Sequence, residues 1–174
     1  MAPLLAENVQ TLEEEIESGE FDAAPLDDSL LNTLHSRICG DLTPQLTNWR
    51  RHDVLVGQHN PPPYYQVSLL MREYGRDLHA RLAATGQTAS DLLLETLAFA
   101  EGRLLFIHPF ADFNGRVTRV FLRLVLRRLD LPAVDLLPPP ARWQDYLEAL
   151  QEADRLNWRP LMLVWQQRFE QEVA

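Results

Sequence analysis

Apolar residues recur at intervals of three and four positions along most of the chain, which is the spacing of amphipathic helices. Glycines and prolines separate these segments, for example Gly19, Gly40, Pro132 and the Pro138-Pro139-Pro140 run. The pattern predicts a loosely helical acidic segment at 7–18, a helix carrying Leu30, Leu31, Leu34 and Ile38, and helices over about 65–82, 90–106, 114–129, 142–154 and 158–172.

One segment, residues 41–63, departs from the helical pattern. It holds Val54-Leu55-Val56, then Gly57, then Asn60-Pro61-Pro62-Pro63, which predicts a short strand or hairpin and a turn. Further on, Thr85-Gly86-Gln87 predicts a break between two helices, and Ser90 a helix N-cap. The expected fold class is therefore all-α, a helical bundle with one short β-hairpin.

The composition sets broad limits. A length of 174 residues favours one domain, and 46% hydrophobic residues are enough for a core. The net charge of −9 argues against a nucleic-acid partner, and all 16 basic residues are arginine. The single cysteine, Cys39, excludes an internal disulfide and fits a buried apolar position better than a catalytic thiol. Without a Sec-type signal or an 18-residue apolar run, no membrane contact and a cytoplasmic location are expected, although secretion as an effector stays open.

Residues 108–119, His-Pro-Phe-Ala-Asp-Phe-Asn-Gly-Arg-Val-Thr-Arg, carry the candidate chemistry. Pro109 disfavours helical geometry at His108, so one helix should end there and another should start near Asn114-Gly115. His108 is either a helix C-cap or a general base, because an imidazole titrates near neutral pH. Asp112 either caps the next helix or helps to hold Mg²⁺ on nucleotide phosphates.

The start of the second helix is a candidate anion site. Its free backbone N–H groups and positive dipole end would lie at Gly115. Arg116 and Arg119 share a face there, and Arg123 and Arg127 extend the stripe. An arginine stripe is usually a solvated face, but residues 101–128 hold six arginines and two acids in an acidic chain, which favours a polyphosphate ligand.

This segment resembles the signature of the Fic (Fic/Doc) family, H-P-F-x-[D/E]-G-N-[G/K]-R-x-x-R. The matching positions are His108, Pro109, Phe110, Asp112, Asn114, Gly115, Arg116 and Arg119. Leu34-His35, Trp49-Arg50, Val54 to Gly57, Pro61 to Pro63 and Tyr146 to Leu150 also look like family landmarks. The resemblance covers roughly residues 30–170, so residues 1–25 are expected to form a helical extension and 26–174 the catalytic domain.

The resemblance implies a protein nucleotidyltransferase, most commonly one that moves AMP from ATP to a Ser, Thr or Tyr hydroxyl of a target protein. His108 would be the base, Asp112 would hold Mg²⁺, and Asn114, Gly115, Arg116 and Arg119 would bind the phosphates. Alternatives are a relative that transfers UMP, phosphate or phosphocholine, and a binding module without catalysis. The family usually has glycine where this chain has Phe113, which bears on loop geometry and on the choice of donor.

Val54, Leu55, Val56 and Gly57 look like the family's target-binding flap, whose free edge would hold a peptide by strand addition. A small hairpin packed on the core is an equal alternative.

Many family members carry an inhibitory helix with the pattern [S/T]-x-x-x-E-[G/N]. In this chain Glu15 is followed by Ile16, and Glu7-Asn8 is preceded by Pro3 where Ser or Thr is expected. We therefore expect restraint by a separate antitoxin-like protein, or none. The alternative that the acidic N-terminal helix inhibits is weaker than a helix that merely packs on the domain.

Overall fold

The computed structural model describes residues 2–85 and 90–172, and its backbone forms helices joined by turns and by the longer segments 40–63 and 129–139. The α-helices are α1 (Ala2–Ser18), α2 (Asp28–Cys39), α3 (Val67–Ala84), α4 (Ser90–Ile107), α5 (Asn114–Arg128), α6 (Trp143–Asp154) and α7 (Arg159–Glu172). Single 3₁₀ turns occur at Pro44–Leu46, Tyr64–Gln66 and Pro140–Arg142. The predicted all-α class is confirmed.

The helix ends follow the local signals in the sequence. Gly19 takes a φ of +88° directly after α1, a conformation that favours glycine, and Gly40 follows the last residue of α2. The Asp27 carboxylate accepts from the Leu30 amide at 3.0 Å and so caps α2. Of the predicted break at Thr85-Gly86-Gln87, only Thr85 lies within the described residues.

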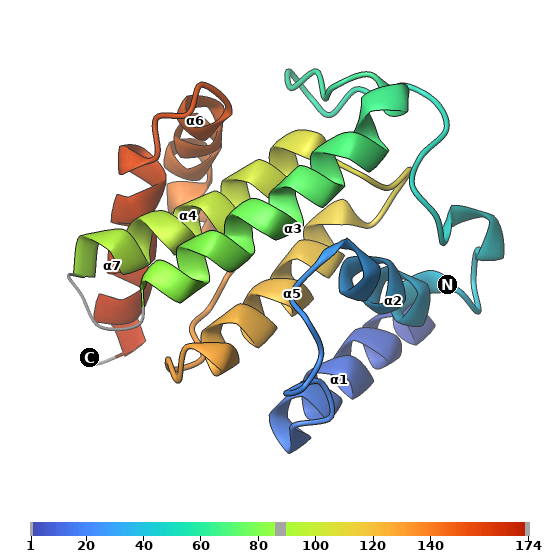
Figure 1. Ribbon diagram of the computed structural model, residues 1–174, viewed down its shortest axis with the longest axis horizontal. Helices are drawn as coiled ribbons and strands as arrows, with labels where there is room; N and C mark the ends of the chain where they lie inside the picture. The colour runs from blue at the N-terminus through green and yellow to red at the C-terminus, as the bar shows by residue number, and fades with distance from the viewer. Residues whose placement is uncertain (1, 86–89, 173–174) are drawn as a thin grey trace.

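The helix α4 occupies the centre of the molecule (Figure 1). It packs against α3 and α5 on one side and against α6 and α7 on the other, and every residue from Thr96 to Gly102 is buried. At Gly102 a side chain would meet Ala153 and Leu161 at 3.0 and 3.1 Å, so the glycine permits this close approach. The central position of α4 fixes where its C-terminal end, next to His108, lies.

A buried ion pair ties three of these helices together. Arg168 on α7 donates to both carboxylate oxygens of Glu101 on α4, at 2.7 and 3.0 Å. The Tyr146 hydroxyl of α6 donates to the same carboxylate, and Arg168 also binds the Leu136 carbonyl. Because each charge has several partners, the network satisfies the groups that burial would otherwise penalise.

The N-terminal helix α1 packs on α2 and α5 (Figure 1). Leu5, Leu12 and Ile16 are buried and join the same hydrophobic core as α2 to α7.

The segment before α3 differs from its prediction. No strand forms among the described residues 41–63; Val56 and His59 make one isolated antiparallel bridge, with N–O distances of 3.0 and 2.9 Å. The hairpin is therefore reduced to a tight turn, because the residues that flank the bridge find no partner strand. Leu55 is 72% exposed, so the core-packing alternative is wrong.

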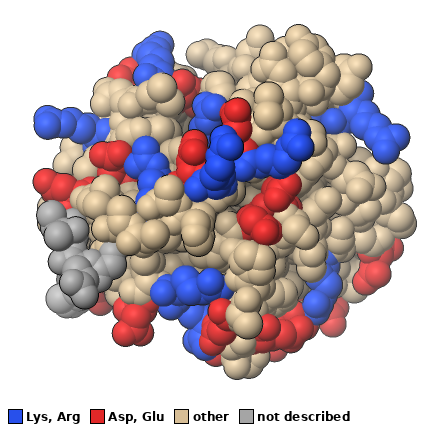
Figure 2. All heavy atoms as spheres, viewed as in Figure 1, with Lys and Arg blue, Asp and Glu red and all other residues tan. Residues whose placement is uncertain are grey.

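The charges on the visible face are mixed. Figure 2 shows arginines and carboxylates side by side, with a broad uncharged area at the upper right of this view. No described helix combines the length and the apolar character needed to cross a bilayer.

Candidate active site

The predicted site loop, residues 108–113, joins α4 to α5 and is closed by two left-handed residues. His108 has a φ of +49° and Phe113 a φ of +64°. The His108 amide still donates to Leu104 at 3.0 Å, so α4 ends at the loop. Phe113 stands where the family signature has glycine, and its positive φ gives the physical reason for that preference.

The Phe110 ring anchors the loop in the core. It is fully buried and stacks on the His35 ring with centroids 3.6 Å apart and planes 1° from parallel. The ring of Trp49 covers it at 4.9 Å. The Nε2 of His35 lies 2.9 Å from the Asp112 carbonyl oxygen, so Nε2 carries the proton. Burial lowers the pKa of His35, which keeps the ring neutral.

The Asn114 side chain acts within the loop. Its amide oxygen accepts from the Phe110 amide and its amide nitrogen donates to the Phe110 carbonyl, both at 2.9 Å. The residue is 2% exposed. The predicted phosphate contact at Asn114 therefore has to come from its backbone, since its side chain is committed to holding the loop.

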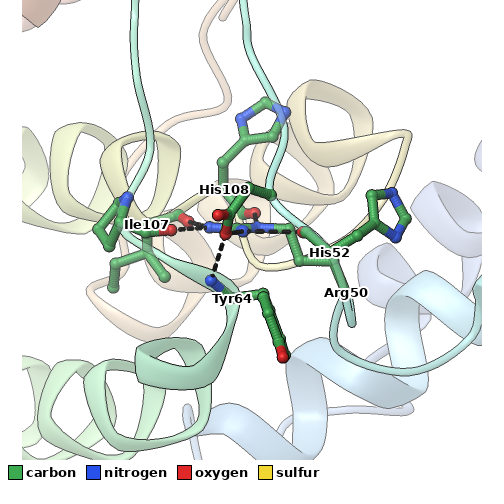
Figure 3. Close-up of polar contacts among 7 residues, drawn as sticks. Arg50, His52, Tyr64, Ile107 and His108 are labelled. Atoms are coloured by element: carbon green, nitrogen blue, oxygen red, sulfur yellow. Dashed lines mark hydrogen bonds and ion pairs between the residues drawn. The ribbon is translucent and has the colours of Figure 1, made fainter.

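Arg50 binds the backbone of the same loop through its guanidinium group (Figure 3). Its guanidinium donates to the carbonyl oxygens of His108 at 2.8 Å, of His52 at 3.1 Å and of Ile107 at 3.3 Å, and also to the carbonyl of Pro62. Its own amide donates to the Pro109 carbonyl at 2.8 Å. One buried arginine thus joins the loop to the two segments that lead into and out of the Val56–His59 turn.

The His108 ring borders a cavity of about 380 Å³ between that turn and α6. Burial, and then the nearby charges of His59 and Arg50, lower the pKa of His108 to about 4. The free protein therefore carries this imidazole neutral at pH 7, the state that accepts a proton. The other walls of the cavity are largely apolar, formed by Val56, Leu105, Leu147 and Leu150.

The first turn of α5 borders a second cavity, of about 530 Å³, which we call the arginine groove. It is lined by Arg116, Arg119, Arg123 and side chains of α1 and residues 135–137. A Cβ built at Gly115 would lie 3.4 Å from Nη1 of Arg119, so the glycine leaves this guanidinium against the helix backbone. Burial lowers the pKa of Arg119, although the residue stays a cation at neutral pH.

The four arginines of the stripe divide into two pairs. Arg123 binds Glu13 at 2.7 Å, and Arg127 makes two bonds to Asp22 at 2.6 and 2.8 Å. Within residues 2–85 and 90–172, no carboxylate lies within 4 Å of Arg116 or Arg119. Of the four arginines, only Arg116 and Arg119 therefore remain candidates for the predicted anion site. Arg123 and Arg127 bind α1 and the turn after it.

Asp112 is exposed, and one carboxylate oxygen accepts from the Phe113 amide at 2.6 Å. No group of three or more metal-binding side chains occurs in the part of the chain that the structure describes. A single carboxylate beside a helix N-terminus fits Mg²⁺ only together with phosphate oxygens and water.

The predicted flap residues line this site unevenly. Val56 and Gly57 border the cavity at His108, whereas Leu55 points its apolar side chain into solvent. Gly57 has a φ of +59°, and a Cβ placed on it would meet no atom within 4 Å. The conformation of the turn, and not crowding, therefore favours glycine at this position.

Arg50 and His59 were not predicted as site residues. Arg50 stands in one of the landmarks, but its contacts to Ile107 and His108 lie 57 and 58 residues away, and no local pattern points to them. His59 lies in a polar turn, where a histidine is not by itself a sign of a functional site.

The chain is similar in sequence and fold to known proteins of one family. The family model of the Fic/DOC family matches residues 25–126. The Drosophila melanogaster protein adenylyltransferase Fic is 32% identical over 130 residues, which cover 74% of this chain and 25% of that protein. The chain thus spans a quarter of the length of that relative.

Two solved structures share the fold. Residues 134–508 of Fic-1 from C. elegans superpose with a TM-score of 0.73 at 23% identity, over 95% of this chain and 48% of that one. A Fic-domain signalling protein from Bacteroides thetaiotaomicron gives 0.72 at 16% identity, over 96% and 66%. With its signature loop, its helical fold and the match over residues 25–126, the chain belongs to the Fic/DOC family.

Proposed function

We propose that this chain transfers AMP from ATP to a Ser, Thr or Tyr hydroxyl of a target protein. The observation that carries the proposal is the pairing of two features at the ends of one short loop. His108 is a neutral imidazole on a cavity at one end, and α5 begins at the other end beside two arginines without carboxylate partners among the described residues.

The chemistry follows from these positions. The target hydroxyl gives its proton to His108 and its oxygen attacks the α-phosphorus, while the bond between the α- and β-phosphates breaks and pyrophosphate leaves. Arg116, Arg119 and the amides at the start of α5 stabilise the negative charge of the phosphates. Mg²⁺, held by Asp112 and the phosphates, would add further charge neutralisation.

A bound nucleotide would change the pKa of His108. The pKa of His108 is about 4 in the free protein, and a polyphosphate bound nearby raises it toward neutrality because an anion favours the imidazolium. His108 then accepts a proton more readily once the donor has bound.

AMP is favoured as the transferred group because the Drosophila relatives are named protein adenylyltransferase. We assign the chemistry to residues 26–174, with residues 1–25 as an extension.

The experiment supplies the protein with Mg²⁺ and ATP labelled on the α- or the γ-phosphate, with a cell lysate as the source of targets. Transfer of the α-label to protein, lost in His108→Ala and kept in His79→Ala, is the expected result. His79 is an exposed residue of α3 and serves as the matched control. Transfer of the γ-label alone would mean that the protein is a kinase. A parallel reaction with α-labelled UTP tests for UMP transfer. Binding of ATP without transfer to lysate proteins or to the protein itself would mean a binding module.

Restraint of the activity forms a separate part of the proposal. We infer inhibition by a separate antitoxin-like protein, or none, because no α1 carboxylate in the described chain pairs with Arg116 or Arg119. Glu7→Gly tests the alternative that α1 inhibits, with Glu14→Gly, at another exposed position of α1, as the control. Stronger transfer by the Glu7 variant alone would contradict the inference.

A further inference from the structure

His59 connects the turn beside the site to two helices. Its backbone closes the bridge with Val56, and its ring contacts α6 and α4. Nδ1 lies 3.1 Å from the Asp154 carboxylate at the end of α6. Nε2 lies 2.9 Å from the Phe106 carbonyl oxygen on α4, two residues before His108.

Both partners of the ring are hydrogen-bond acceptors. A neutral imidazole has one N–H and could donate to only one of them, whereas the imidazolium donates to both. The ring also packs at an angle against Phe106, with centroids 5.6 Å apart, which fixes its orientation. The geometry therefore calls for the doubly protonated ring.

The electrostatics agree with this geometry. The hydrogen bond to Asp154 raises the pKa of His59, against the opposing effect of burial. The side chains of His59 and Asp154 are 21% and 24% exposed, so the pair is only partly screened by water. The charged group that acts on His59 is Asp154, and those that act on His108 are His59, Arg50 and Asp112.

The position of the pair gives it a role. Val56, Gly57 and His59 line the cavity at His108 from the turn, and Asp154 lines it from α6. The His59–Asp154 contact thus joins the turn to α6 within the cavity lining, and the contact to Phe106 ties the turn to the helix that ends at His108.

We propose that His59 is a positioning residue, whose imidazolium clamps the Val56–His59 turn to α6 and α4 and so sets the width of the cavity at His108. Its positive charge also keeps the neighbouring His108 unprotonated. The effect on transfer rests on the proposed function, while the clamp itself does not.

The clamp has a definite pH dependence. A raised pKa in the folded state means that the contribution of His59 is complete below its unfolded pKa of about 6.5. It is lost as the pH rises through the folded value. The turn should therefore loosen on the alkaline side.

The test compares Asp154→Asn and His59→Gln with His79→Gln. NMR of the ring nitrogens should find both nitrogens of His59 protonated at pH 6.5, and Asp154→Asn should lower the pKa of His59. Hydrogen exchange of the Val56 and His59 amides, corrected for its intrinsic pH dependence, should become roughly tenfold faster in both variants and unchanged in the control. A His59 ring with one proton at pH 6.5, or unaltered exchange in Asp154→Asn, would overturn the clamp.

The transfer assay supplies a second readout. In both variants KM for the target should rise more than kcat falls, and the pKa of His108 should rise in His59→Gln because the neighbouring charge is gone. If the wild-type protein transfers nothing, the proposed function fails, and the NMR and exchange results still decide whether the clamp exists. Asp154→Asn keeps the size and hydrogen-bonding ability of the side chain, so it separates loss of charge from loss of fold.

Discussion

The Nε of Arg50 donates to the carbonyl oxygen of His108 at 2.8 Å across 58 residues of sequence. Lysine offers a compact ammonium group and cannot match the planar fork that reaches four carbonyl groups. We expect Arg50→Lys to lower the free energy of unfolding by about 2 kcal/mol, measured by urea denaturation. The exposed neighbour Arg51→Lys serves as the control, and an equal effect of the two changes would contradict the role of Arg50.

The side chain of Asn114 holds both polar atoms of the Phe110 backbone. In Asn114→Asp a carboxylate replaces the donor, and the buried Phe110 carbonyl loses its partner. Unfolding should require about 1–3 kcal/mol less free energy than in the wild type, which a urea titration at pH 7 measures. Asn60→Asp, at an exposed position, should change little. A stable Asn114→Asp protein would show that the loop closes without this contact.

Phe113 tests the cost of the left-handed conformation. Glycine adopts a φ of +64° freely, and alanine does not. Both substitutions remove the ring and its contact with Arg116, at 5.5 Å, so the comparison between them isolates the backbone. Phe113→Gly should be more stable than Phe113→Ala by about 1 kcal/mol in thermal or urea denaturation. The reverse order would mean that the loop changes conformation in the variants.

Arg119 and Arg127 differ in their partners, although both belong to the stripe. Arg119→Gln should weaken ATP binding roughly 10- to 100-fold, as loss of a charge-assisted contact does, with little loss of stability. Arg127→Gln breaks an exposed ion pair with Asp22 and should change stability little while leaving ATP binding intact. Calorimetry with ATP and Mg²⁺ distinguishes the two, and equal losses of affinity would point to a general effect of charge.

His108 gives a pH dependence of a defined sign. Its folded pKa of about 4 lies below the unfolded value of about 6.5, so the unfolded chain binds the extra proton first. The free energy of unfolding should fall as the pH drops from 6.5 to 4, by roughly 2 kcal/mol after allowance for partial exposure. His108→Gln should lack this part of the slope. An NMR titration of the ring with a midpoint near 6.5 would contradict the prediction.

The helices were largely predictable, because the spacing of apolar residues and the positions of Gly19, Gly40 and Pro109 are local signals. The turn that Val54 to Gly57 adopt was not predictable. A strand forms only where a partner strand pairs with it, and the sequence of this segment does not show whether such a partner exists. Residues 108–119, the most informative segment of the sequence, form the loop between α4 and α5 and the first turns of α5. The inward role of the Asn114 side chain depends on how that loop folds back on Phe110.

The division of the arginine stripe had a similar cause. Four arginines on one face look equivalent in the sequence, and only the packing of α1 assigns Glu13 and Asp22 to the last two. His59 and Asp154 lie 95 positions apart in numbering, so their contact arises from tertiary structure alone.

The docking of α1 has a consequence for solution conditions. Its apolar residues bury into the core, but the pair of Glu13 with Arg123, each side chain 32% exposed, is open to screening by dissolved ions. At physiological ionic strength such charges are screened over about 8 Å, and at 1 M over about 3 Å. Since Glu13 and Arg123 both line the arginine groove, added salt weakens an ion pair in the groove lining and also the attraction for a polyphosphate. Buffer composition is therefore a variable of this binding site and has to be held constant whenever variants are compared.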